Sequence, residues 1–233
     1  MRRFGSFVWL LLRKDLRIEL RTKEVLIVTL FFSSLVSLVA GISFYSGALA
    51  TSAFAPGAMW LPVAFASVLA TARFWQRERE NDALSGILLS AAPRTAIYVA
   101  KVTLLVLFLL VVALLVVPMA ALFFHIELLV FGGKLAALAL MVSVGASAIS
   151  ALFGVMTVRT GARDLMLSAV LFPLLAPLIM TAVAGTRELL LTIEAGQVAQ
   201  WSELRDYVLL LGVFDFVALF LGAGLFHLLV EDA

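Results

Sequence analysis

The feature that most constrains the fold is the segment 97–124, an almost uninterrupted run of leucine, valine and other apolar residues. A helix of about 20 apolar residues spans the hydrocarbon core of a bilayer, and this run is longer. The rest of the chain has the same character, since 64% of its 233 residues are hydrophobic and only 14% are charged. Soluble domains have about 45–50% apolar and about 25% charged residues. The sequence therefore predicts an integral membrane protein.

Five further apolar segments have the character of membrane spans, which gives six in all. The second span of the chain, 58–71, is short, but it continues into a polar stem, so hydropathy underestimates the length of its helix. A loop rich in Gly, Ala, Ser and Pro (47–57) precedes it, and prolines at 173 and 177 predict a broken or bent fifth helix. With no strong internal repeat, we predict an all-α integral membrane protein with six transmembrane helices in one domain, 1–233. The five segments are 25–45, 58–71, 135–158, 165–184 and 207–230.

The N-terminal segment 1–24 has the pattern of an amphipathic helix. Its apolar run is short and Arg-Lys-Asp follows, which is not typical of a signal peptide. Leu12, Leu16 and Leu20 fall on one ridge of a helix, and arginines fall on another. Each cation close to anionic lipid headgroups would contribute about 1 kcal/mol. We therefore predict an interfacial helix that lies on the membrane surface.

The segment 73–101 is the one long polar stretch between two apolar runs. Its first half alternates cations and anions, which predicts a solvated helix continuing out of the second span. Its second half carries an apolar knob, formed by Leu84, Ile87, Leu88 and Leu89, before Pro93 ends the helix. This pattern is typical of a docking site for a partner protein, and equally of a short helix resting on lipid headgroups. The candidate coupling residues are Arg77, Glu78, Arg79, Glu80, Asp82, Leu84, Ile87 and Leu88.

Lysine and arginine are distributed unequally between the two sides of the six-span arrangement. Of the 17, 14 lie on the side that carries the N-terminus and 73–101, and three lie on the other, at Lys134, Arg187 and Arg205. Loops with an excess of Lys and Arg stay in the cytoplasm. We predict that both termini and the coupling loop 73–101 are cytoplasmic, and that 185–206 is a periplasmic loop with short surface helices.

Motifs for catalysis are missing from the sequence. There is no G-x-x-x-x-G-K-[ST], so the chain has no P-loop for ATP phosphates, and there is no H-E-x-x-H or G-x-S-x-G. With two histidines and no cysteine, thiolate metal sites and disulfides are excluded. The net charge of +2 is too small to suggest nucleic acid as a partner. We therefore expect neither an enzyme nor a metal site.

Three isolated residues could still carry chemistry. Asp215 lies inside the sixth span, where an acid costs about 2.5–3.5 kcal/mol on insertion scales. It is either a polar group in a transport path or buried pair, or a neutral carboxyl near the outer interface. His125, with Glu127, could ligate a haem iron at the outer surface, although one exposed histidine more often binds nothing. Trp60 is either a member of an interfacial aromatic belt or a stacking contact for a ligand.

Three stretches carry a resemblance to a known family. They are LLRKDLRIELRTKE at 11–24, RERENDALSGILL at 77–89 and AAPRTAIYVAK at 91–101. Together with the number and order of the spans, they resemble haem exporter protein B (CcmB), the membrane permease subunit of the cytochrome c maturation system. This chain departs from the family pattern at Asp82-Ala83, where an acidic-Asp-Gly turn is expected.

The resemblance implies a fold similar to six-span ABC exporter permeases, in the bacterial inner membrane. The implied partners are a separate ABC ATPase, a haem-handling membrane subunit, a small single-span subunit and a periplasmic haem chaperone. A second copy of this chain in the complex is compatible with that set. ATP would act through the ATPase, and haem would be delivered, or its loaded chaperone released, within the complex. The alternatives are a permease of another ABC exporter and a passive assembly scaffold.

Overall fold

The computed structural model describes residues 2–43, 51–80, 86, 93–160, 164–197 and 200–231. Seven helices and no strand occur in these ranges. Six of the helices are long and apolar enough to cross a membrane, which confirms the predicted all-α membrane architecture. The helices are α1 (Arg2–Thr22), α2 (Glu24–Ser43), α3 (Thr51–Glu80), α5 (Arg94–Phe123), α6 (Leu128–Thr160), α7 (Asp164–Glu194) and α8 (Trp201–Glu231).

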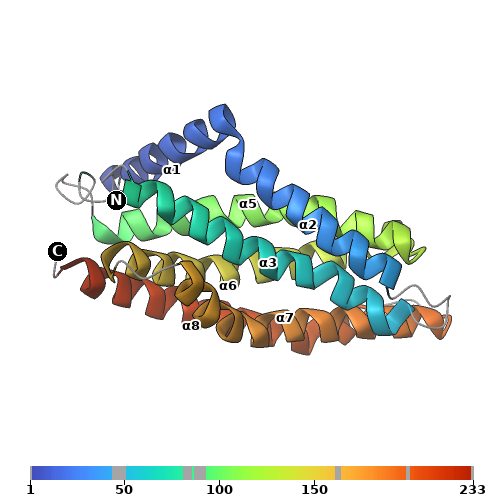
Figure 1. The fold of residues 1–233 in the computed structure, drawn as a ribbon. Coiled ribbons are helices and arrows are strands. Elements are labelled where there is room, and N and C mark those ends of the chain that lie inside the picture. Colours follow the sequence, from blue (N-terminus) through green and yellow to red (C-terminus); the bar gives the residue numbers. More distant parts are fainter. Residues whose placement is uncertain are drawn as a thin grey trace.

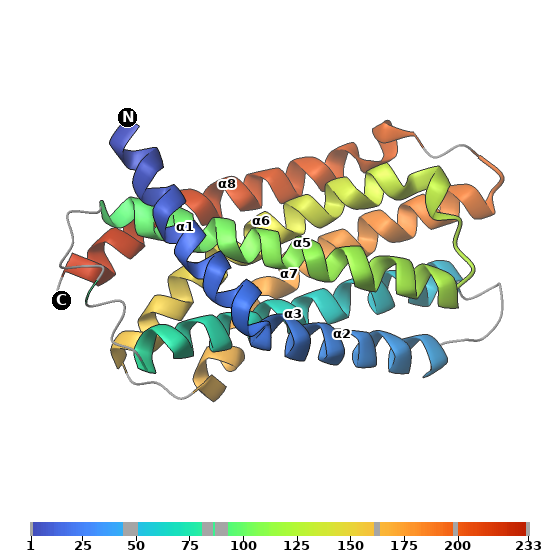
Figure 2. The same cartoon turned by 90° about the horizontal axis from the view of Figure 1, so that it is seen from above.

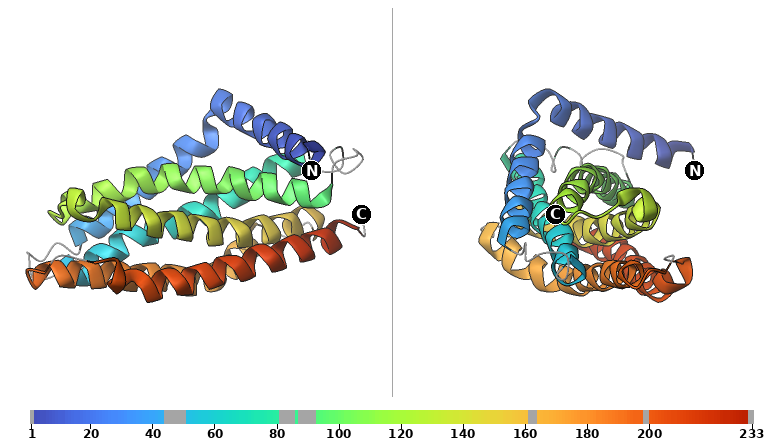
Figure 3. Two further views of the ribbon diagram at one scale, coloured as in Figure 1. Left: turned by 180° about the vertical axis from the view of Figure 1, so that it is seen from behind. Right: turned by 90° about the vertical axis from the view of Figure 1, so that its right-hand side faces the viewer.

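The six long helices run side by side, and α1 is set across one end of them (Figure 1). From above, α1 passes over α5 before the chain turns into α2 (Figure 2). The view along the bundle shows α1 lying outside the ring of spans (Figure 3). The end of α3, the start of α5 and the end of α8 lie at the same end of the molecule, which we call the α1 end.

The core of the bundle lies around α6. Of the 18 apolar residues that identify its span, 72% are buried, against 17% of the corresponding residues of α8. Large apolar side chains cover the outside of α8, among them Phe216 and Phe220. Lipid tails are as apolar as these side chains, so the exposed face of α8 suits a bilayer.

The second span is longer at its start than predicted. Residues 51–57, expected to be a loop, are the first turns of α3, which continues through Pro56. Glu194, at the end of α7, explains this start, because its carboxylate accepts hydrogen bonds from the Ser52 amide (3.2 Å) and the Ser52 hydroxyl (3.0 Å). A carboxylate at a helix N-terminus satisfies free amides and the positive end of the helix dipole.

The predicted loop 185–206 is also largely helical. Helix α7 continues to Glu194, and α8 begins at Trp201. The reason is that Thr186, Leu189 and Leu190 keep the helical spacing and are buried against the bundle. The predicted short surface helices are therefore the ends of two spans.

Helix α7 is continuous through Pro173 and Pro177. Figure 1 shows that it changes direction in its first half, as expected of a proline-containing span. One turn after the second proline, Thr181 donates a hydrogen bond to the Pro177 carbonyl at 2.8 Å.

Candidate functional site at the α1 end of the bundle

The polar stem of α3, 73–80, packs into the protein. Trp75 and Glu78 are buried, so the prediction of a solvated helix is wrong for this face. The Trp75 indole lies against α6 at Gly154, where an added Cβ would overlap the ring. Helix α1 covers another side of the stem, as the contacts below show. The stem is therefore a structural element wedged between α1 and α6.

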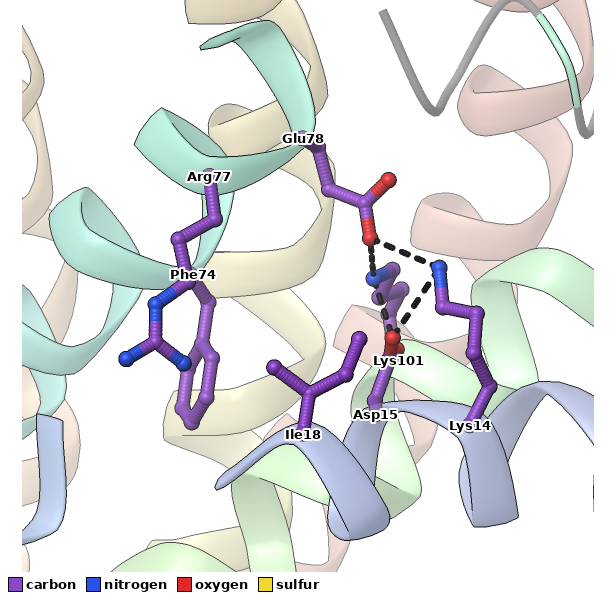
Figure 4. Close-up of a pocket in the computed structure, with 7 residues that line it drawn as sticks. All are labelled: Lys14, Asp15, Ile18, Phe74, Arg77, Glu78 and Lys101. Atoms are coloured by element: carbon purple, nitrogen blue, oxygen red, sulfur yellow. Dashed lines mark hydrogen bonds and ion pairs between the residues drawn. The ribbon is translucent and has the colours of Figure 1, made fainter. Parts of the chain in front are cut away.

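A buried group of charges joins three helices at this point (Figure 4). Lys101 of α5 donates to Asp15 of α1 at 2.7 Å and to Glu78 of α3 at 2.5 Å. Lys14 of α1 completes the group, with its ammonium 3.1 Å from Asp15 and 3.3 Å from Glu78. We call Lys14, Asp15, Glu78 and Lys101 the ion cluster. Its two ammonium groups balance its two carboxylates.

This balance is what allows the charges to be buried. An unpaired ion away from water is strongly disfavoured, whereas close opposite charges with good hydrogen bonds offset the loss of hydration. Lys101, near the start of α5, is buried between two carboxylates. Its ammonium also lies 5.7 Å from the centre of the Trp75 ring, which favours the cation further.

A second link, which we call the Glu19 bridge, ties α1 to both α2 and α3. Arg77 of α3 donates to Glu19 at 2.7 Å, and the other Glu19 carboxylate oxygen accepts from the backbone amide of Leu26 at 2.8 Å. Arg77 also reaches Glu24 at 3.2 Å. Lys23, with φ of 54°, forms the elbow at which α1 becomes α2. One carboxylate therefore fixes the geometry of three helices.

Two acidic side chains of α1, Asp15 and Glu19, are buried against the bundle. The leucine spacing in the sequence does not predict this. Leu12, Asp15 and Glu19 are buried on one face, whereas Leu20 of the predicted ridge is 67% exposed. Asp15 and Glu19 were missed as site residues. Their signal in the sequence is their spacing of three and seven residues from Leu12, which places all three on one side of a helix.

Tyr98 extends the site from α5 to the far side of the bundle. It lies one turn before Lys101, and its hydroxyl donates to the carbonyls of Ala148 in α6 (3.1 Å) and Ala218 in α8 (3.5 Å). An added Cβ at Gly222 would overlap this hydroxyl. The start of α5 is therefore in contact with four other helices, α6 and α8 through Tyr98 and α1 and α3 through the ion cluster.

A pocket of about 400 Å³ opens beside the ion cluster. Figure 4 shows the charged side chains of α1, α3 and α5 converging on it, with two apolar side chains at its wall. The arrangement can hold charge and join helices. Its lining residues are Lys14, Asp15, Ile18, Phe74, Arg77, Glu78 and Lys101.

The predicted coupling residues divide into two sets. Arg77, Glu78, Arg79 and Glu80 lie on the last turns of α3. The rest of the predicted set, Asp82, Leu84, Ile87 and Leu88, lies outside the described residues. Of the first set, the structure assigns Arg77 and Glu78 to contacts that hold the fold together.

Trp60 and His125 lie apart from the ion cluster. Trp60 is completely buried, and its indole donates to the Thr186 hydroxyl at 2.8 Å, so the interfacial-belt interpretation is wrong for this residue. His125 is exposed in the turn after α5, with φ of 55°. It lines a pocket of about 340 Å³ with Gly41, Ile42, Leu122 and Phe123, and Trp60 is not among the lining residues. Within the described ranges, no three His, Asp or Glu side chains gather as a metal site would require.

Asp215 is buried near the middle of its span. It lies 14 residues after Trp201 and 11 before Phe226, the limits of the spanning segment of α8. At about 1.5 Å per residue, its carboxyl is roughly 16 Å or more from either end. The carboxyl therefore lies in the middle part of α8 and not near either end of the helix.

Comparisons with known proteins give one family. A family model described as CcmB protein matches residues 6–224, a segment that contains the ion cluster, the Glu19 bridge and Asp215. A comparison with curated proteins finds no match.

Proposed function

The chain belongs to the CcmB protein family, whose members are membrane permease components of the haem exporter system for cytochrome c maturation, and we propose that it couples a separate ABC ATPase to cytochrome c maturation. The observation that carries the proposal is the ion cluster. It joins the two helices that flank 81–92 to the interfacial helix α1. The segment 81–92, the central part of the predicted coupling loop 73–101, is accordingly the proposed point of contact.

The contacts define a route for motion from this loop into the bundle. A displacement of the loop by the ATPase would move the end of α3 and the start of α5 together, because Glu78 and Lys101 bind each other. From there the Glu19 bridge leads to α1 and α2, and Tyr98 leads to α6 and α8. A cluster with few alternative arrangements transmits displacement rather than absorbing it. All of the route is made by residues of this chain.

The apolar knob is the proposed contact with the ATPase. An apolar group on a charged stem suits a socket with a hydrated rim, where buried side chains supply most of the binding energy. The support for this role is that the end of α3 and the start of α5, which flank 81–92 in the sequence, lie at the α1 end (Figure 2). Arg79 and Glu80 are the proposed rim residues.

The α1 end is proposed to face the cytoplasm of a bacterium, in its inner membrane. The support is the charge bias, since 14 of the 17 Lys and Arg residues belong to segments on this side. We expect a reporter fused after Ala233 to be active in the cytoplasm, and one inserted near Gly196, in the turn between α7 and α8, to be active in the periplasm. Activity in the reverse pattern would overturn the orientation.

The proposed partners are the ABC ATPase, a haem-handling membrane subunit, a small single-span subunit and a periplasmic haem chaperone, with a second copy of this chain also compatible. ATP use by the partner would deliver haem or release the haem-loaded chaperone. The test is purification of the tagged chain in a mild detergent. We expect a P-loop ATPase and a haem-loaded periplasmic protein to elute with it. Elution with a different substrate-binding protein would point to another ABC exporter instead.

A further inference from the structure

The Asp215 carboxyl occupies a notch in α6. The notch exists because residue 145 is glycine, and an added Cβ there would overlap one Asp215 carboxyl oxygen. Leu178 of α7 and Phe214 close the space, since their side chains would lie 2.9 and 3.3 Å from the same added Cβ. Asp215 is only 6% exposed. The carboxyl is therefore enclosed by three helices.

Neither carboxyl oxygen of Asp215 has a hydrogen-bond partner among the described residues. The nearest described charged residues along α6, α7 and α8 are Lys134, Arg187 and Asp206. They lie at least nine residues from Gly145, Leu178 and Asp215 respectively, which is roughly 13 Å or more along a helix.

Helix α5 also packs against α8. Of its ionisable groups, Arg94 is its first residue, at the α1 end, and Tyr98 and Lys101 are engaged elsewhere. The Tyr98 hydroxyl bonds to backbone carbonyls of α6 and α8. The Lys101 ammonium is held by Asp15 and Glu78. No described cation is thus in position to balance a negative Asp215. A carboxylate without a partner in apolar surroundings is so unfavourable that the group takes up a proton instead.

We propose that Asp215 is a proton-binding site inside the membrane, occupied by a proton while α8 packs on the Gly145 notch of α6. The ligand is the proton itself, and the site is distinct from the coupling site at the α1 end. Release of the proton requires water or a cation to reach the carboxyl, which requires α8 to separate from α6. By linkage, a state of the bundle that hydrates Asp215 is favoured by high pH, and the packed state by low pH.

Carbodiimide labelling of the full chain in liposomes tests the site. A membrane-soluble carbodiimide reacts with a protonated carboxyl: the carboxyl oxygen adds to the central carbon of the reagent and the carboxyl proton moves to a reagent nitrogen. The peptide then gains the mass of one reagent molecule. We expect Asp215 to be labelled by dicyclohexylcarbodiimide, less so as the pH rises, and not by a water-soluble carbodiimide. Asp206, exposed at the start of the same helix, is the matched control and should show the opposite preference.

Asp215→Asn gives an independent readout. Asparagine has the size of a neutral carboxyl and no charge, so the melting temperature in detergent should stay within a degree or two of the parent value if the proton is bound. A clear fall would mean that the parent carries a carboxylate with a cationic partner, which would overturn the proposal. So would the absence of label on Asp215 from the membrane-soluble reagent at low pH.

Discussion

Lys101→Met is expected to lower the free energy of unfolding by about 3–5 kcal/mol, the usual effect of removing one partner from a buried ion pair. Methionine fills similar space, so the loss comes from charge: Asp15 and Glu78 would face each other with only Lys14 between them. Because the cluster joins α1, α3 and α5, we also expect α1 to come loose. Thermal unfolding in detergent measures the first effect, and limited proteolysis near Lys23 measures the second.

Lys14→Met is the matched control, since it removes a cation from the same cluster. The Lys14 side chain is 37% exposed, and exposed pairs contribute about 0–1 kcal/mol. A triple variant that adds Asp15→Asn and Glu78→Gln to Lys101→Met should recover much of the loss, because the one charge of the cluster that then remains is Lys14, whose side chain is 37% exposed and can be hydrated. Equal effects of Lys101→Met and Lys14→Met would show that the cluster is hydrated and that its burial contributes nothing.

Ile87→Asp combined with Leu88→Asp is expected to abolish binding of the ATPase while the chain still inserts in the membrane. Each apolar side chain buried in a socket contributes about 1.5–3 kcal/mol, and a carboxylate placed there is left without a partner. Cytochrome c maturation should stop in cells that carry this variant. The measurement is the amount of ATPase that elutes with the tagged chain over a series of salt concentrations.

The controls for this variant are Arg79→Ala and Glu80→Ala. Arg77 and Glu78 are unsuitable, because they belong to the Glu19 bridge and the ion cluster and their loss would disturb the fold. Rim charges contribute about 0–1 kcal/mol, so each of these variants should only weaken binding of the ATPase. The binding that remains should come from the apolar contacts, which salt does not screen. If the double Asp variant retains the ATPase while the rim variants lose it, the apolar knob rests on lipid.

The two main predictions separate docking from transmission. The Lys101→Met chain keeps the apolar knob, so the ATPase should still bind, but its turnover should no longer respond to the membrane subunit. The double Asp chain keeps the ion cluster, so its stability should be unchanged. A passive scaffold would instead show ATP turnover that is indifferent to Lys101→Met in an assembled complex.

The sequence by itself determined the six spans, the interfacial helix and the helical stem, because each depends on a pattern within about 20 neighbouring residues. Apolar length identifies a span, and a spacing of three and four identifies a helix face. The same local logic misjudged the ends of α3 and α7. The start of α3 is set by Glu194 binding Ser52, a contact between residues 142 positions apart, and α7 continues because Thr186, Leu189 and Leu190 are buried against the bundle.

Only the tertiary structure decided which charges are buried. In the sequence, Asp15, Glu78 and Lys101 each look like solvated surface residues, because each lies in a polar stretch. They are buried because α1 folds across α3 and α5 and brings opposite charges from three distant segments within hydrogen-bonding distance. A single charge in any of these segments would be too costly to bury, so the burial is a property of the assembled cluster and cannot be derived from any one helix.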